Sequence, residues 1–378
     1  MQAAHVREYD MTAFSPLENI LFKLIRDEGP ISLETFMRHA LLHPEHGYYS
    51  KNIAIGRAGD FITAPEISQV FGELVGAFLC DVWTQIGRPD PFCLVEFGPG
   101  RGTLMEDALR AARTAPGFLN AMNLHCIEAN KTLRKMQSHK LENYRPVFHE
   151  SLDTLPEHSP LLCVANEFLD ALPIRQFEVT DNGFAERRVC INENYEKEEA
   201  ALFRITLEPC SADDIKGKLT NTAALKTGDI IEVSPEQTDF VVGLSERLKA
   251  QGGLALFIDY GYDVPAAKDT LQALSSHKYA DPLTKPGERD MTAHVDFLSL
   301  RMTGVRNGMC VYGPKPQGEW LALLGIEHRR ARLVQNANNA DSRTIESGID
   351  RLINPGEMGS LFKVMVMTAN ETIKPAGL

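Results

Sequence analysis

A glycine-rich turn preceded by an acid is the part of the sequence whose residues best fit ligand chemistry. Glu96 precedes Gly98, Gly100 and Gly102, and together they end the apolar run that begins at residue 92. Glycine has no Cβ, so three alternating glycines let the backbone come close to a ligand. The dinucleotide fingerprint needs its third glycine where Thr103 stands, and a phosphate loop needs a Lys after Gly102. Glu96 also suits a cationic ligand better than a pyrophosphate.

This turn resembles the first motif of the class I S-adenosylmethionine-dependent methyltransferases, in which the glycine loop passes the amino acid part of the cofactor. The resemblance implies that Glu96, Gly98, Gly100 and Gly102 bind S-adenosyl-L-methionine. One alternative is a tight turn between a strand and a helix without a ligand, although glycine triplets after a buried strand seldom serve packing alone. A nicotinamide cofactor is a weaker option because of the glycine spacing.

Polar residues at the ends of the next two predicted strands could complete a nucleoside site. Glu128 ends the strand 123–128, where it can accept hydrogen bonds from both ribose hydroxyls, as the acid about 20 residues on does in dinucleotide folds. The other interpretation is a solvated Glu at the start of a helix. Ser151 and Leu152 follow the strand 146–149, where this fold contacts the edge of the adenine.

The catalytic candidates follow the fourth strand. Asn166 and Glu167 come directly after the apolar run 161–165, and in class I methyltransferases this strand end is where the acceptor atom lies. An N-cap role would explain Asn166 but not Glu167, so we expect Glu167 to be catalytic. His294, in the segment 290–297 that starts a helix, could orient Glu167 or take up a proton. A cap contact of that helix is an equal alternative for His294.

The elements that position these residues alternate between apolar runs and helical periodicity, which predicts an α/β, Rossmann-like fold. Seven strands are expected at 92–97, 123–128, 146–149, 161–165, 254–261, 309–312 and 361–367. We divide the chain into a helical N-terminal cap region (1–90), a methyltransferase core (91–173 and 236–378) and a β-rich insertion over the site (174–235). A loop rich in Ser, Pro and Gly is expected between the fifth strand and residue 290.

Composition narrows the class of protein. The 378 residues carry a formal net charge of −12, which argues against a general nucleic-acid binder. The seven cysteines form no C-x-x-C pair, which favours a reducing compartment. His43, Glu45 and His46 lack metal-ligand spacing, and Pro44 and Gly47 predict a turn, so no metal is expected. Without a signal peptide, a transit peptide or an apolar run of about 18 residues, we expect a cytoplasmic protein that does not insert into membranes.

Six segments, distributed over nearly the whole chain, resemble the MidA family of class I methyltransferases. They are residues 43–49, 59–68, 96–103, 166–173, 258–261 and 292–297. The family includes the mitochondrial arginine methyltransferase that assists complex I assembly. The resemblance implies S-adenosyl-L-methionine as cofactor and an arginine of a protein, such as a complex I subunit, as acceptor. It also implies that a loop around Asp60 and Thr63 helps to cover the cofactor, and the missing transit peptide points to a bacterial relative.

An arginine acceptor sets a specific chemical demand. A guanidinium is a poor nucleophile because it stays protonated, with a pKa above about 12. A buried carboxylate can hold it bidentately and localise its charge away from the attacking nitrogen. Glu167 is the candidate for that carboxylate, with Asp170 or Asp259 as its helper. The alternatives are methylation of another acceptor, or a cofactor-binding assembly chaperone with weak activity; a homodimer through the N-terminal helices also stays open.

Overall fold

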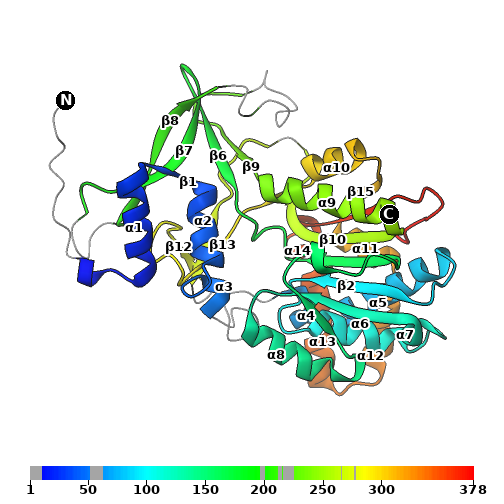
Figure 1. Ribbon diagram of the computed structural model, residues 1–378. Helices are drawn as coiled ribbons and strands as arrows, with labels where there is room; N and C mark the ends of the chain where they lie inside the picture. The colour runs from blue at the N-terminus through cyan, green and yellow to red at the C-terminus, as the bar shows by residue number, and fades with distance from the viewer. Residues whose placement is uncertain are drawn as a thin grey trace. The chain divides into compact units, whose positions relative to one another are not determined.

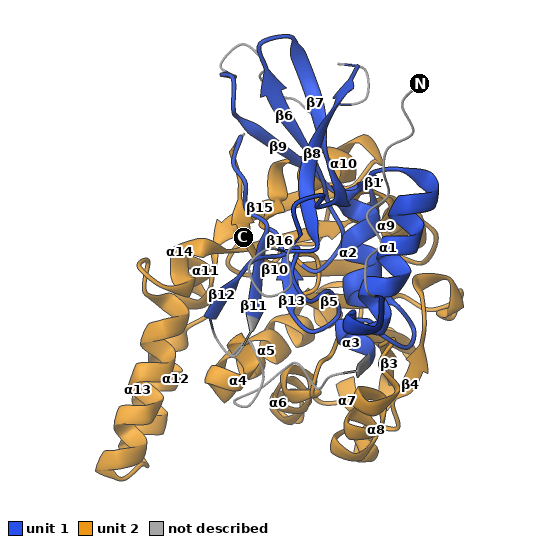
Figure 2. Ribbon diagram, turned by 90° about the vertical axis from the view of Figure 1, so that its left-hand side faces the viewer, with its two compact units in different colours: residues 1–54, 171–236, 265–293 blue, residues 55–170, 237–264, 294–378 orange. Residues whose placement is uncertain are grey.

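The computed structural model describes residues 11–51, 63–195, 201–211, 215, 225–264, 266–275 and 278–378. The chain divides into two compact units, each assembled from separate stretches (Figure 2). Unit 1 comprises residues 1–54, 171–236 and 265–293, and unit 2 comprises residues 55–170, 237–264 and 294–378. The domain boundaries expected from the sequence stay a prediction.

The seven expected strands lie in one sheet of unit 2, to which the short strand β14 (Val295–Asp296) adds an eighth (Figure 1). The seven are β2 (Phe92–Phe97), β3 (Met122–Ile127), β4 (Val147–His149), β5 (Leu161–Asn166), β10 (Gly253–Tyr262), β15 (Cys310–Pro316) and β16 (Phe362–Thr368). The order across the sheet is β15-β16-β10-β5-β2-β3-β4, and β16 is antiparallel to both of its neighbours. Strand β14 pairs with β10. The predicted Rossmann-like α/β fold is therefore confirmed.

Helices cover both faces of this sheet. They are α4 (Ala64–Ile67), α5 (Gln69–Gln85), α6 (Thr103–Ala112), α7 (Phe118–Ala121), α8 (Lys131–Lys140), α9 (Pro235–Gln251), α10 (Phe297–Arg306), α11 (Gln317–Leu323), α12 (Ile326–Gln335), α13 (Asn339–Ile353) and α14 (Met358–Leu361). Leu94 of β2 shares one core with α5 and α6. Phe97 points to the opposite face, because side chains alternate along a strand, and packs edge-on against Phe240 of α9 with 4.9 Å between ring centroids. In the described part of the chain, no helix is both long and apolar enough to cross a membrane.

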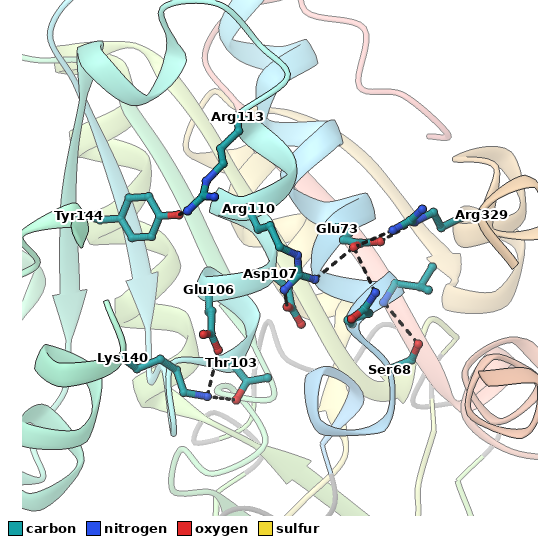
Figure 3. A network of polar contacts seen from close by, with 12 residues as sticks. Ser68, Glu73, Thr103, Glu106, Asp107, Arg110, Arg113, Lys140, Tyr144 and Arg329 are labelled. Carbon is teal, nitrogen blue, oxygen red and sulfur yellow. Dashed lines mark hydrogen bonds and ion pairs between the residues drawn. The ribbon is translucent and has the colours of Figure 1, made fainter. Parts of the chain in front are cut away.

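Ionic contacts join three helices of unit 2 around a single carboxylate. Glu73 of α5 bonds Arg110 of α6 at 3.1 Å and Arg329 of α12 at 2.7 Å (Figure 3). The Glu73 side chain is only 11% exposed, so the carboxylate is largely shielded from competing water. These contacts hold α5, α6 and α12 together within unit 2.

Unit 1 contains α1 (Pro16–Glu28), α2 (Leu33–Leu42), α3 (Tyr48–Lys51) and a five-stranded antiparallel sheet. The strands of this sheet are β1 (Ile31–Ser32), β6 (Arg175–Thr180), β7 (Gly183–Ile191), β8 (Phe203–Cys210) and β9 (Ile230–Val233). The antiparallel strands predicted after residue 173 are thus confirmed. The predicted turn at residues 43–47 is also present, closed by a hydrogen bond from the Gly47 N–H to the His43 carbonyl at 2.9 Å.

A second small sheet of unit 1 corrects the predicted loop between the fifth strand and residue 290. Strands β11 (Gln272–Ser275), β12 (Lys278–Ala280) and β13 (Asp290–Thr292) form a three-stranded antiparallel sheet there. None of these strands is longer than four residues. An alternating pattern needs four to eight residues to be recognised, so Pro and Gly dominated the prediction.

Candidate active site

A pocket of unit 2 lies at the carboxyl ends of β2 and β5, the edge of the sheet where open α/β folds bind ligands. The glycine turn, the ends of both strands and the start of α4 form its walls. Its lining residues are Thr63, Pro65, Glu66, Glu96, Gly98, Pro99, Gly100, Arg101, Thr103, Leu104, Asn166 and Glu167. The residues singled out in the sequence that meet here are Thr63, Glu96, Gly98, Gly100, Asn166 and Glu167.

The glycine turn has the backbone conformation that requires glycine. Gly98, Gly100 and Gly102 have φ angles of +59°, +55° and +75°, in the left-handed region where other residues are strained. A Cβ on Gly98 would stand 3.1 Å from the ring of Phe168. The turn is braced from outside the pocket, because Nε2 of Gln137 on α8 donates to the Gly100 carbonyl at 2.8 Å.

Glu96 is the most deeply buried acid of the pocket, with 3% of its surface exposed. Among the described residues, its Oε2 atom has no hydrogen-bond partner. Burial, together with the negative charge of Glu128, raises the pKa of Glu96 to about 8. An unpaired carboxyl oxygen at this depth costs free energy unless a ligand compensates it, so the site favours a cationic group beside Glu96.

Asn166 and Glu167 form a second polar group at the end of β5. Oε1 of Glu167 accepts hydrogen bonds from Nδ2 of Asn166 at 3.2 Å and from the backbone N–H of Ala64 at 2.9 Å. Oδ1 of Asn166 is buried and has no partner among the residues that the structure describes. Burial raises the pKa of Glu167 to about 7. The pocket therefore offers carboxylate and amide oxygens, which are acceptors for a cationic donor.

Helix α4 closes one side of the pocket through two contacts within unit 2. Besides the Ala64 contact, the Thr103 hydroxyl donates to Oε1 of Glu66 at 2.6 Å. Lys140 of α8 donates to the same hydroxyl oxygen at 3.1 Å (Figure 3). Thr63 occupies the N-cap position of α4 and lines the pocket. The preceding residues of the predicted covering loop, including Asp60, lie outside the described residues.

Other predicted cofactor residues lie outside the pocket lining. Glu128 accepts hydrogen bonds from the Asn130 N–H at 2.8 Å and from Nε2 of Gln137 at 3.1 Å. Burial raises its pKa, so Glu128 is not simply a solvated acid. Since Gln137 also bonds the Gly100 carbonyl, one side chain links Glu128 to the glycine turn. Gly102 is the N-cap residue of α6 and is not among the lining residues.

The residues predicted to contact adenine or to take up a proton do not line the pocket. Ser151 and Leu152 lie at the short 3-10 helix Leu152–Thr154 that follows β4, outside the pocket lining. The His294 ring packs edge-on against Tyr260 with 5.4 Å between centroids, also outside the lining. The structure therefore brings Asn166 and Glu167 to the glycine turn, whereas His294 is not among the lining residues.

Sequence reasoning missed two charged residues of the lining, Glu66 and Arg101. Arg101 lies within the glycine turn identified from the sequence, but its positive charge was not considered in that prediction. Glu66 belongs to the motif 59–68, yet only folding brings it to Thr103, 37 positions later in the chain.

Comparisons with known proteins agree with this geometry. Residues 74–315 match a family model described as "Putative S-adenosyl-L-methionine-dependent methyltransferase". The chain is 34% identical to the mitochondrial protein arginine methyltransferase NDUFAF7 homolog of Drosophila melanogaster, covering 91% of this chain and 82% of the relative. It is 32% identical to the human mitochondrial protein arginine methyltransferase NDUFAF7, covering 95% and 84%.

A solved structure extends the likeness to the fold. A protein of Burkholderia thailandensis, crystallised with S-adenosyl-homocysteine bound, superposes with a TM-score of 0.81 at 26% identity. The match covers 99% of this chain and 97% of that one.

Proposed function

This chain belongs to the family of S-adenosyl-L-methionine-dependent methyltransferases, and on that premise we propose that it methylates an arginine side chain of a protein. Its cofactor is S-adenosyl-L-methionine. The observation that carries the proposal is the Glu167 carboxyl group, held beside Asn166 in the same pocket as the glycine turn.

The pocket fits the amino acid end of the cofactor. The unpartnered Oε2 of Glu96 is suited to accept a hydrogen bond from an ammonium group. Gly98 and Gly100 allow close backbone approach, and Arg101 supplies a cation for a carboxylate. These residues are our candidates for holding the methionine part of the cofactor.

The remaining cofactor roles are assigned from position in the fold. Glu128 is the candidate for the ribose hydroxyls, and Ser151 and Leu152 are candidates for the adenine side. Gly102 gives the turn its shape, and Thr63 stands at the start of α4, where it lines the pocket.

The cofactor supplies an electrophilic methyl group, and the protein aligns the acceptor, which can contribute about 7–11 kcal/mol to lowering the barrier. The ionised Glu167 is suited to accept two hydrogen bonds from a guanidinium, while Oδ1 of Asn166 accepts a third. These contacts hold positive charge on the bonded nitrogens and leave the remaining nitrogen more nucleophilic. His294 stays a candidate for taking up a proton.

The balance of charge supports a cationic acceptor. In the described pocket lining, Glu66 and Glu167 remain as acids once Glu96 and Arg101 are assigned to the ammonium and carboxylate groups of the cofactor. Two relatives that match most of the chain are named protein arginine methyltransferases. We further propose that the acceptor is a complex I subunit and that the protein is cytoplasmic, both of which labelling in cells would test. We also propose a homodimer, which measurement of the oligomeric state in solution would test.

The test is transfer of a radioactive methyl group to protein. Purified protein and methyl-labelled S-adenosyl-L-methionine are added to an extract of host cells that lack this chain, and labelled proteins are hydrolysed to amino acids. We expect the label in methylarginine, and its absence with the Glu167→Gln variant. Label in another amino acid or in a small molecule would replace arginine as the acceptor. No label, with cofactor binding intact, would favour an assembly chaperone.

A further inference from the structure

Glu167 has an unusual backbone conformation for a residue with a side chain. Its φ angle is +49°, in the left-handed region where few residues other than glycine are found. Such a conformation costs free energy and persists only where the surrounding structure enforces it. The contacts that enforce it therefore decide where the Glu167 carboxyl group points.

The neighbouring strand holds the backbone at Glu167 and directly after it. The Glu167 N–H donates to the Ile258 carbonyl at 2.9 Å, and a buried carboxyl group of the same strand contacts the three residues that follow. Asp259 of β10 is fully buried and stands one residue beyond the last pair of β10 with β5, which is Ile258 with Asn166. Its Oδ2 atom accepts hydrogen bonds from three consecutive backbone N–H groups: Phe168 at 3.2 Å, Leu169 at 2.9 Å and Asp170 at 3.2 Å.

The other carboxyl oxygen is also engaged. Oδ1 of Asp259 accepts from the Tyr260 N–H at 2.9 Å. Burial and the nearby carboxyl groups of Asp170 and Glu167 raise the pKa of Asp259, and the N–H donors oppose that rise. N–H groups donate to both oxygens of the Asp259 carboxyl group, so both oxygens are acceptors. An Asn side chain has only one acceptor oxygen and cannot make the same contacts.

We propose that Asp259 is a positioning residue, which holds Glu167 in its left-handed conformation and thereby directs the Glu167 carboxyl group into the pocket. Three N–H groups that converge on one oxygen form an anion-binding concavity, and the carboxylate of Asp259 fills it from within the protein. The importance of this contact for methyl transfer rests on the proposed role of Glu167. Its effect on the turn does not.

A further contact fixes the far end of the turn. The Tyr260 hydroxyl donates to Oδ2 of Asp170 at 2.6 Å, so two consecutive residues of β10, Asp259 and Tyr260, bond this turn. Asp170, the other helper considered from the sequence, is thus held by β10 rather than aimed at the pocket. It is absent from the described pocket lining, as is Asp259.

A double-mutant cycle on unfolding temperature tests the positioning role without any acceptor. Glycine adopts a positive φ at little cost, so Glu167→Gly removes the strain that Asp259 counteracts. We expect Asp259→Asn to lower the unfolding temperature by about 4 °C or more in the natural chain. In the Glu167→Gly background the same change should lower it by less than half as much. Equal decreases in both backgrounds would overturn the proposal.

Asp296 provides the matched control. It is a half-buried carboxyl group that caps α10 by accepting from the Ser299 N–H at 3.0 Å, and it has no part in the turn. Asp296→Asn should destabilise equally with and without Glu167→Gly. If Asp259→Asn alone does not fold, the proposal expects folding to be recovered when Glu167→Gly is added, and failure in both backgrounds would contradict it.

Activity then separates this proposal from the proposed function. Asp259→Asn should lower kcat by about 100-fold while the calorimetric affinity for S-adenosyl-homocysteine is kept, since misplacement of a reacting group by about 1 Å has this effect. Activity unchanged in a folded Asp259→Asn variant would contradict the link from Asp259 to catalysis. A natural chain that methylates no arginine, with the stability coupling present, would refute only the acceptor.

Discussion

The backbone N–H of Ala64 donates a hydrogen bond to Oε1 of Glu167 at 2.9 Å, and this contact ties the start of α4 to the end of β5. The two residues are 103 positions apart in the chain. Helix α4 directly follows the segment expected to cover the cofactor. The carboxyl group proposed to bind the acceptor is therefore connected to the start of α4 within unit 2.

Replacing Glu167 by Gln tests its proposed role. The amide oxygen can still accept from Ala64, so the fold and the binding of S-adenosyl-homocysteine should be kept. Methyl transfer should fall by about 100-fold or more, because an amide lacks the charge that pairs with a guanidinium. The measurement is kcat/KM with the acceptor found by labelling. Glu106→Gln, on the α6 surface beside Lys140, is the control and should leave kcat/KM unchanged.

The same carboxyl group should set the pH dependence of the reaction. Only ionised Glu167 pairs with a cation, and burial raises its pKa to about 7. The rate of the natural chain should therefore rise with pH through a midpoint near 7 and level off above it. This midpoint should be absent from the Glu167→Gln profile. An unchanged profile in that variant would assign the titration to another group.

Glu96→Gln should increase the free energy of unfolding at high pH and weaken ligand binding. The pKa of Glu96 is raised to about 8, so the folded state binds this proton more tightly than the unfolded state does. Stability from this group is present below its unfolded pKa and decreases as pH rises toward the folded value. We expect Glu96→Gln to be more stable than the natural chain at pH of about 9, by about 1–3 kcal/mol, with little difference at pH of about 4. Denaturant unfolding at both pH values measures this.

The cost of Glu96→Gln should appear in the cofactor site. Loss of a charge-assisted hydrogen bond of about 1.5–3 kcal/mol should weaken S-adenosyl-homocysteine binding by about 10- to 100-fold in calorimetry. Replacing the exposed Glu371 by Gln should change neither quantity. Full affinity in Glu96→Gln would show that this carboxylate does not hold the ammonium group.

A pair of glycine substitutions separates backbone strain from pocket filling. Gly98 and Gly308 have φ angles of +59° and +74°, so Ala at either should cost about 1–2 kcal/mol. A methyl group at Gly308 meets no atom within 4 Å, whereas one at Gly98 stands 3.1 Å from the Phe168 ring. Only Gly98→Ala should weaken S-adenosyl-homocysteine binding, which calorimetry on both folded variants measures. Equal affinities would place the ligand away from the glycine turn.

Glu73→Gln should affect stability alone. Burial raises the pKa of Glu73, but hydrogen bonds from Arg329 and Arg110 outweigh it, and the pKa is lowered overall (Figure 3). The carboxylate therefore stabilises the fold at neutral pH, and this contribution is lost as pH falls through its folded pKa. We expect Glu73→Gln to lose about 1–2 kcal/mol at pH 7, discounted for the partial exposure of Arg329, with a smaller loss at acid pH. Changed S-adenosyl-homocysteine affinity would contradict the structural assignment.

The sequence by itself determined the sheet and the position of the glycine turn. Apolar runs of four or more residues, separated by helical periodicity, depend on local burial patterns and are visible in one dimension. The turn after residue 97 was predictable because its glycines are required by a backbone conformation that other residues adopt only with strain. Strands β11, β12 and β13 were missed because they are short and lie in a segment whose Ser, Pro and Gly residues predict a loop.

Only the tertiary structure decided which polar groups meet and in what state. The contact of Ala64 with Glu167 and that of Asp259 with the turn at Phe168 join segments about 90 to 100 residues apart, and no local pattern encodes such a pairing. The raised pKa values of Glu96 and Glu167 likewise follow from burial, which depends on everything packed around them. Residue types and spacing thus indicated the chemistry, and folding set its geometry and charge, because electrostatic effects depend on distances in space rather than along the chain.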